Sequence, residues 1–147
     1  MAQTPTLTGQ DIAEAQGAVT RLLERSLAGT GATRHDYVIL RVLTTRGPFR
    51  SPKELHEFLA GQQQLGLTTE DVADVLAGME QRGLAAGTGR DDAGPAEATP
   101  EGAALLARLT QLVVPATRQL FGGFDPDDLA TAHRVLTQVI ERADQIN

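Results

Sequence analysis

The chain has 147 residues, with 13 Lys and Arg against 19 Asp and Glu, a net charge of −6 and no cysteine. This length fits one domain, whose core must be aliphatic because aromatic residues make up only 3% of the chain. The absence of cysteine excludes disulfides and thiolate metal sites, and neither a signal peptide nor a membrane-spanning run is evident. We therefore expect a cytoplasmic protein without a metal or cofactor, which could bind DNA only through a locally basic face.

Capping signals and apolar periodicity predict a mainly helical chain. Successive helices are expected to start near Thr8, Thr33, Ser51, Thr69, Thr99 and Asp125. The first ends at Gly29-Thr30-Gly31, the second stops at Gly47-Pro48 and the fourth ends at Gly83. Pro115 should bend the long helix over residues 103–121.

A polar, Gly-rich stretch, Leu84 to Ala98, lies between two of these helices. It is too poor in apolar residues for a core element, so we predict a β-ribbon with a mobile tip. The order helix, connection, helix, ribbon, helix over residues 51–102 is typical of a winged helix-turn-helix.

Three phrases within residues 79–102 carry a family resemblance. Met79-Glu80-Gln81-Arg82-Gly83-Leu84, then Asp91-Asp92, then Ala98-Thr99-Pro100-Glu101-Gly102 resemble the recognition-helix end, wing and helix restart of the MarR (multiple antibiotic resistance regulator) family. The resemblance implies a single MarR-like domain over residues 1–147, mainly α with a small β-wing. In it, residues 8–30 and 103–147 form dimerisation helices, and residues 33–102 form the winged-helix lobe with its wing at 84–98.

The sequence departs from the family at the surface expected to meet DNA. Residues 60–65 lengthen the helix-turn-helix connection, either as an extra turn on the supporting helix or as a device that re-aims the recognition helix. Glu70, Asp71 and Asp74 occupy the first two turns of the recognition helix, where they would repel phosphates. The wing has Gly87 and Ala93 where the family carries arginines. The remaining candidate DNA contacts are Lys53, Thr68, Thr69, Arg82 and Arg90.

A cluster at the start of the second helix is the candidate ligand site. His35 supplies an imidazole, Tyr37 offers a hydroxyl and Arg41 can hold an anion. The resemblance implies a ligand pocket nearby, between the dimerisation helices and the DNA-binding lobe. The predicted ligand-binding residues are Arg21, Arg25, His35, Tyr37, Arg41 and Phe49. In the alternative interpretation Tyr37 is a core residue, Asp36 a helix cap and the arginines exposed.

Two functional hypotheses follow. The first is a MarR-like, ligand-responsive transcriptional regulator that binds double-stranded DNA as a homodimer and responds to an apolar or aromatic small molecule. The second is a MarR-like scaffold that has lost DNA binding and serves as a small-molecule binder or an enzyme, with His35, Tyr37 and Arg41 as catalytic candidates. A weaker third hypothesis is a protein-protein module with an acidic face. We expect His56 to lie on a solvated helix face and His133 at the rim of the terminal helices.

Overall fold

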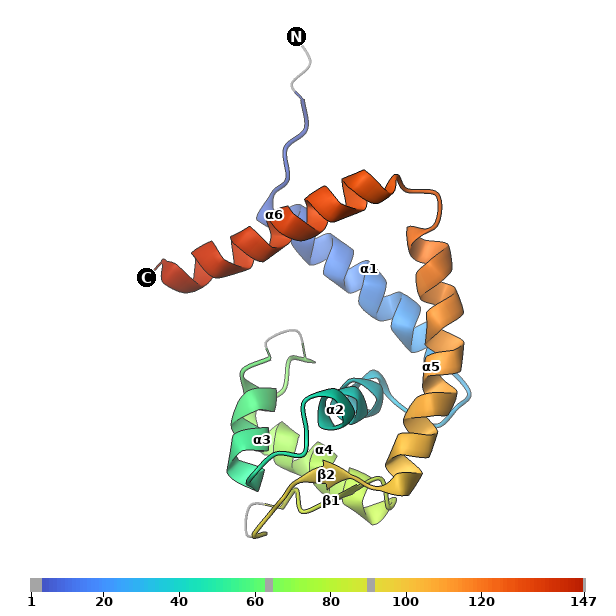
Figure 1. Ribbon diagram of the computed structural model, residues 1–147, viewed down its shortest axis with the longest axis vertical. Coiled ribbons are helices and arrows are strands. Elements are labelled where there is room, and N and C mark those ends of the chain that lie inside the picture. The colour runs from blue at the N-terminus through green and yellow to red at the C-terminus, as the bar shows by residue number, and fades with distance from the viewer. Residues whose placement is uncertain (1–3, 63–64, 90–91, 147) are drawn as a thin grey trace. The chain divides into compact units, whose positions relative to one another are not determined.

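The computed structural model describes residues 4–62, 65–89 and 92–146. Figure 1 shows helices joined by short loops, with one small antiparallel β-ribbon. In chain order the elements are α1 (Gly9–Leu27), α2 (Arg34–Thr45), α3 (Pro52–Ala60), α4 (Thr69–Gln81), β1 (Ala85–Ala86), β2 (Glu97–Ala98), α5 (Pro100–Phe121) and α6 (Pro126–Gln145). The predicted fold class, mainly α with a small β-wing, is confirmed.

The helices begin where side chains can cap them. Thr8, Thr33 and Thr68 each form a reciprocal capping box with an aspartate three residues later. Ser51 accepts a hydrogen bond from the backbone N–H of Glu54 at 3.3 Å, and Pro52 follows at the first helical position. Among the described residues, α3 has this serine cap but no reciprocal bond from the Glu54 side chain.

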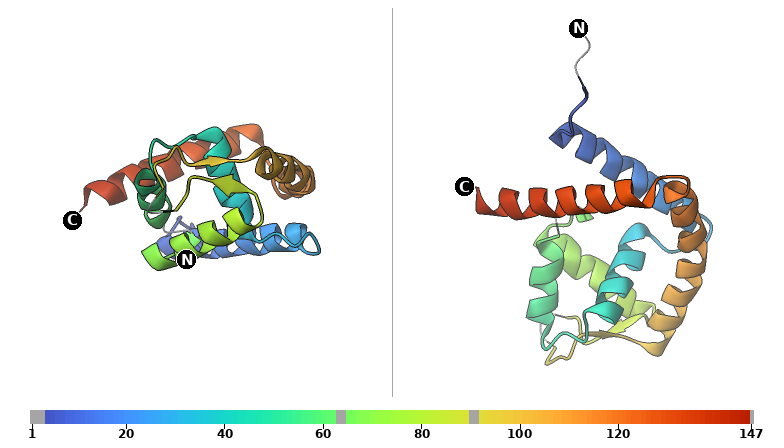
Figure 2. Two further views of the ribbon diagram at one scale, coloured as in Figure 1. Left: turned by 90° about the horizontal axis from the view of Figure 1, so that it is seen from below. Right: turned by 45° about the horizontal axis from the view of Figure 1, so that its top comes forward.

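The chain divides into two compact units, the first ending at Ala116 and the second beginning at Thr117. In the first unit α2 lies between α3 and α5 in each view of Figures 1 and 2. Its buried side chains form one face of a core shared with α3, α4 and the wing, which includes Ile39, Leu40, Leu55, Leu59, Leu76 and Met79. A second cluster, Leu27, Tyr37 and Leu109, joins α2 to α1 and α5.

The base of the wing belongs to the core, so the expectation that residues 84–98 contribute nothing to it is wrong. Leu84, Ala85 and Ala96 are buried, and Ala96 forms a β-bridge with Phe49 of the α2–α3 loop. Small side chains suffice here because the ribbon lies directly against the helices. The low apolar content of residues 84–98 therefore did not reveal how strongly the wing is anchored to the core.

The second unit comprises the end of α5 and the whole of α6, joined at Gly122-Gly123. Asp125 caps α6 by accepting a hydrogen bond from the Asp127 N–H at 2.8 Å. No residue of α6 is buried, although Leu136, Val139 and Ile140 line up along it at helical spacing. α5 stays helical through Pro115, and the bend expected there stays a prediction. Within the described residues, no helix is both long and apolar enough to cross a membrane.

Candidate nucleic-acid interface and ligand cleft

The helix-turn-helix consists of α3, a long connection and α4. α3 ends at Ala60, and the connection that follows is anchored by Leu65, which is only 2% exposed and whose N–H bonds to the carbonyl of Gln62. The interpretation of the inserted residues as an extra turn on α3 is therefore wrong: they lengthen the connection. Residues 63 and 64 of this insertion lie outside the described part of the chain.

The first two turns of α4 present a negative face. Glu70, Asp71 and Asp74 are all exposed. Hydrogen bonds from the backbone and side chain of Thr68 hold the pKa of Asp71 below its usual value, so this carboxylate is ionised at neutral pH. The surface that a groove-reading helix would turn toward DNA thus carries the sign that phosphates repel.

Arg82, at the end of α4, is committed to an internal ion pair. Its Nη1 and Nη2 donate to the two carboxylate oxygens of Asp36 at 3.0 and 2.8 Å. Burial acts to raise the pKa of Asp36, but hydrogen bonds from Arg82 and Thr33 and the charge of Arg82 outweigh it and hold the pKa below its usual value. The same bond raises the pKa of Arg82. Arg82 was expected at a DNA contact; its guanidinium instead braces α4 against α2.

The backbone of the wing explains why one of the two expected arginines is absent. Gly87 has φ +71°, and a Cβ there would collide with the backbone carbonyl of Pro95. The position therefore requires glycine for steric reasons. Ala93 is exposed and carries no such restriction. Arg90, a predicted DNA contact, lies outside the described residues, as does Asp91.

Two exposed cations beside the wing were missed from the sequence. Arg46 and Arg50 belong to the α2–α3 segment, which the Phe49–Ala96 bridge ties to the wing. Lys53 follows on the first turn of α3, where its ammonium lies 3.8 Å from Glu57. The signal that could have revealed the group was the close spacing of cations around Gly47-Pro48 and Ser51-Pro52. Together these three side chains form the basic edge of the lobe.

The predicted threonine contacts lie at the start of α4. The Thr68 hydroxyl accepts a hydrogen bond from the Asp71 N–H at 3.1 Å, so it acts as the helix cap. Thr69 is exposed at the first helical position. A phosphate that approaches either residue also comes close to the carboxylates that follow them in α4.

The six predicted ligand-binding residues are not gathered in one site. Tyr37 is buried, and the exposed Arg41 guanidinium lies 5.6 Å from the centre of its ring. Phe49 packs against Phe58 in the other core cluster, at a centroid distance of 5.9 Å. Arg21 and Arg25 are exposed on α1. His35 lines a cleft beside α1.

That cleft, of about 440 Å³, lies at the junction of α1 and α2. Its lining includes Glu24, Leu27, Thr33, Arg34 and His35. Arg34 and Glu24 form an ion pair at 3.7 Å, and the Nε2 of His35 lies 3.1 Å from the carbonyl oxygen of Leu65. Since a carbonyl can only accept, this Nε2 donates. His35 thereby connects the cleft with the segment that leads into α4.

His56 is buried, at 7% exposure, so its expected place on a solvated helix face is wrong. Its Nε2 lies 2.7 Å from the carbonyl oxygen of Thr88 in the wing, and the Thr88 N–H donates to Glu80 of α4 at 2.9 Å. This chain of hydrogen bonds ties α3, the wing and α4 together. His133 is exposed on α6. No group of three or more His, Asp or Glu side chains is placed to hold a metal ion within the described residues.

Comparison with solved structures identifies the architecture. MarR from E. coli in its oxidised form has a TM-score of 0.71 at 20% identity, covering 92% of this chain and 96% of its own. A MarR family protein of Mycobacterium tuberculosis in complex with DNA gives 0.65 at 25% identity, covering 91% and 98%. CouR from Rhodococcus jostii bound to p-coumaroyl-CoA gives 0.67 at 21% identity, covering 90% of each chain.

No protein-family model matches the sequence, and no curated protein matches it significantly. The structural likeness nevertheless extends over nine-tenths of the chain. The chain therefore has the winged-helix fold of MarR-family transcriptional regulators.

Proposed function

We propose that this protein is a ligand-responsive transcriptional regulator that binds double-stranded DNA as a homodimer. The arrangement of α3, α4 and the wing carries the proposal. The fold that contains these elements matches that of a MarR family protein solved in complex with DNA. In this arrangement α4 is the helix that enters the major groove and the wing is the ribbon that follows the backbone.

Phosphate contacts come from the basic edge of the lobe, Arg46, Arg50 and Lys53, and from Arg90 in the wing. Thr68 and Thr69 approach the backbone at the start of α4. Arg82 contributes indirectly, because its bond to Asp36 fixes the position of α4. Few cations face the DNA and three carboxylates oppose it, so the affinity is weak and rises at low salt.

The dimer forms through the terminal helices. Leu136, Val139 and Ile140 on α6 are 38%, 39% and 62% exposed, and Leu112 on α5 is 47% exposed. Apolar stripes of this kind mark protein interfaces when they are left in water. A second copy of the chain covers them, so that two recognition helices read half-sites about one helical turn apart.

The ligand binds in the cleft between α1 and α2. Arg34 supplies a cation, Leu27 an apolar wall and His35 a hydrogen-bonding ring. An aromatic acid fits this chemistry: its carboxylate competes with Glu24 for Arg34, while its ring covers the apolar wall. Among proteins with this fold, the M. tuberculosis protein has also been solved with salicylic acid.

The hydrogen bond from His35 to Leu65 links the ligand cleft to the segment that leads into the recognition helix. Leu65 lies three residues before Thr68, the cap of α4. A ligand that moves the His35 ring therefore pulls on the segment that sets where α4 begins. The ligand-free and ligand-bound proteins would then hold α4 in different positions and bind DNA with different affinities. Coupling between two separate sites requires such a difference.

A mobility-shift assay with the promoter regions flanking the protein's own gene, at low salt, tests the proposal. We expect a retarded protein–DNA complex that dissociates when an aromatic acid is added. The variants Arg50→Ala and Lys53→Ala should bind the DNA more weakly. Arg108→Ala, an exposed arginine on α5, is the matched control and should bind like the wild type.

The carboxylates of α4 favour one competing function, a small-molecule-binding scaffold that no longer binds DNA. Ligand binding in the α1–α2 cleft, with no retardation of any flanking fragment at low salt, would establish it. Such a result would place His35, which lines that cleft, again among the candidates for chemistry.

A further inference from the structure

The carboxylate of Asp74 lies on the second turn of α4, beyond the part of the helix that favours acidic residues. Glu70 and Asp71 belong to the first turn, where the helix dipole stabilises carboxylates, and Asp71 also accepts a hydrogen bond from the Thr68 N–H at 3.0 Å. The dipole effect fades beyond that turn, and aspartate is a poor helix former. Within the part of the chain that the structure describes, Asp74 is exposed and has no hydrogen-bond or ion-pair partner. The stability of the helix therefore does not account for this residue.

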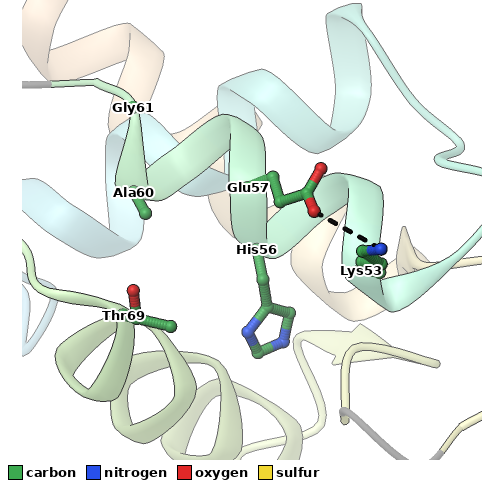
Figure 3. Close-up of a pocket in the computed structure, with 6 residues that line it drawn as sticks. All are labelled: Lys53, His56, Glu57, Ala60, Gly61 and Thr69. Carbon is green, nitrogen blue, oxygen red and sulfur yellow. Dashed lines mark ion pairs between the residues drawn. The ribbon is translucent and has the colours of Figure 1, made fainter.

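The packing of α4 turns Asp74 away from the core of the lobe. Val72 and Leu76 are buried in the core that α4 shares with α3. At about 3.6 residues per turn, a residue two positions from each of them lies on nearly the opposite side of the helix. Figure 3 shows the side of α4 that faces α3, where the His56 ring projects from α3 toward α4. Asp74 therefore lies in the middle of the outward face, which is the face turned toward DNA in the proposed function.

The neighbours of Asp74 on this face let the helix approach a groove closely. Ala77 and Gly78 follow it by three and four residues, so they lie beside it on the helix surface. Ala77 is exposed, and a Cβ at Gly78 would meet no atom within 4 Å. Neither position carries a long side chain that would hold the helix away from the base edges. The short Asp74 side chain therefore comes within reach of the bases when α4 lies in the major groove.

The chemistry of a carboxylate restricts which base it can contact. A carboxylate accepts hydrogen bonds and donates none. In the major groove, guanine presents two acceptors, and thymine presents an acceptor and a methyl group. Adenine presents its amino donor beside the N7 acceptor, which a carboxylate repels, whereas cytosine presents its N4 amino group alone. Cytosine is therefore the base that a carboxylate selects.

We propose that Asp74 is a specificity-determining residue, which selects a cytosine in each half-site by accepting a hydrogen bond from the N4 amino group of that base. This inference rests on the proposed DNA binding and adds the base that the recognition helix reads. The charge of Asp74 repels the phosphates of every sequence alike, whereas its hydrogen bond forms only where cytosine is in place. Asp74 therefore lowers the affinity for unrelated DNA and raises the ratio of specific to non-specific binding.

Selection of binding sites from a randomised library of DNA duplexes by the intact protein tests the proposal. The sites that the wild type enriches should carry a cytosine at one fixed position of each half-site. Asp74→Asn should change the preferred base at that position to adenine, because an asparagine amide pairs with N6 and N7 of adenine. Asp128→Asn, which changes an exposed aspartate of α6, is the matched control and should keep the cytosine.

A change of one group in the DNA isolates the hydrogen bond. N4-methylcytosine still pairs with guanine, but its methyl group replaces the hydrogen that faces the major groove. In an enriched site, this base should weaken wild-type binding by at least about fivefold per half-site, the factor that corresponds to about 1 kcal/mol. Asp74→Ala should show no such loss. It should also bind unrelated DNA more tightly than the wild type, because one repelling carboxylate is gone.

Thermal unfolding of each variant establishes that it is folded before binding is compared. If wild type and Asp74→Asn enrich the same base at every position, the inference is overturned and the proposed DNA binding stands. An equal effect of N4-methylcytosine on wild type and Asp74→Ala would overturn the inference as well. If the wild type enriches no sequence at low salt, the proposed DNA binding itself is overturned, and this inference with it.

Discussion

Arg82→Met should destabilise the protein by removing the partner of a buried carboxylate. Asp36 is 3% exposed in its side chain and accepts two hydrogen bonds from Arg82. Methionine keeps much of the arginine's length and apolar stem, so the change removes the charge and the donors more than the packing. It leaves Asp36 with the 3.0 Å bond from the Thr33 N–H.

The expected loss in the free energy of unfolding is about 2 kcal/mol. Breaking a buried ion pair from one side costs about 3–5 kcal/mol. The Arg82 side chain is 45% exposed, so solvent already screens part of the attraction, and the remaining bond from Thr33 stabilises the carboxylate. For a chain of this length, a loss of about 2 kcal/mol lowers Tm by roughly 4–8 °C.

The effect has a defined dependence on pH. The folded-state pKa of Asp36 is lowered, so the stabilisation is present above the unfolded-state value of 3.8 and is lost as pH falls through the folded-state pKa. The difference between wild type and Arg82→Met should therefore be full near neutral pH and shrink below about pH 4.

Urea denaturation measures this difference. All variants are compared at the same protein concentration, because the proposed dimer would make stability depend on concentration. Arg108→Met, which changes an exposed arginine of α5, is the control. Asp36→Asn and the double variant complete a mutant cycle, in which Arg82→Met should cost much less once Asp36 is neutral. A cost that is independent of pH, or equal in both backgrounds, would refute the assigned role of the ion pair.

Gly102→Ala should strongly destabilise the protein, because its Cβ would collide with the backbone carbonyl of Leu84, whereas Gly78→Ala meets no atom within 4 Å and should stabilise α4 by about 0.5–1 kcal/mol in thermal unfolding. Leu136→Asp should convert a sedimenting dimer into monomer or aggregate; a wild type that sediments as a monomer would contradict the proposed dimer. Ala93→Arg should raise DNA affinity if the wing reaches DNA, and unchanged affinity would argue that it does not. The slope of log K against log salt should be no steeper than about −5, because few cations contact phosphates.

The fold was readable from the sequence because its signals are local. Threonine and aspartate at three-residue spacing start α1 and α2, and Gly83 ends α4 in the left-handed conformation, with φ +76°. These features act within one turn of helix, so neither tertiary packing nor a partner was needed to find them.

The site was harder to predict because its residues act across elements. Nothing in the sequence near Arg82 indicates that its partner is Asp36, or that His56 meets Thr88, which follows it by 32 residues. Tyr37 and Arg41 lie in the same helix as His35, yet only His35 faces the cleft beside α1. Packing decides the direction in which each side chain points, and the sequence alone does not show it.

Hydroxyl-radical footprinting of the DNA flanking the protein's own gene, at low salt, tests whether the protein is a ligand-responsive DNA-binding dimer. We expect two protected patches about one helical turn apart, and we expect the protection to be lost when an aromatic acid occupies the α1–α2 cleft. Uniform cleavage of every flanking fragment at protein concentrations that saturate ligand binding would contradict it.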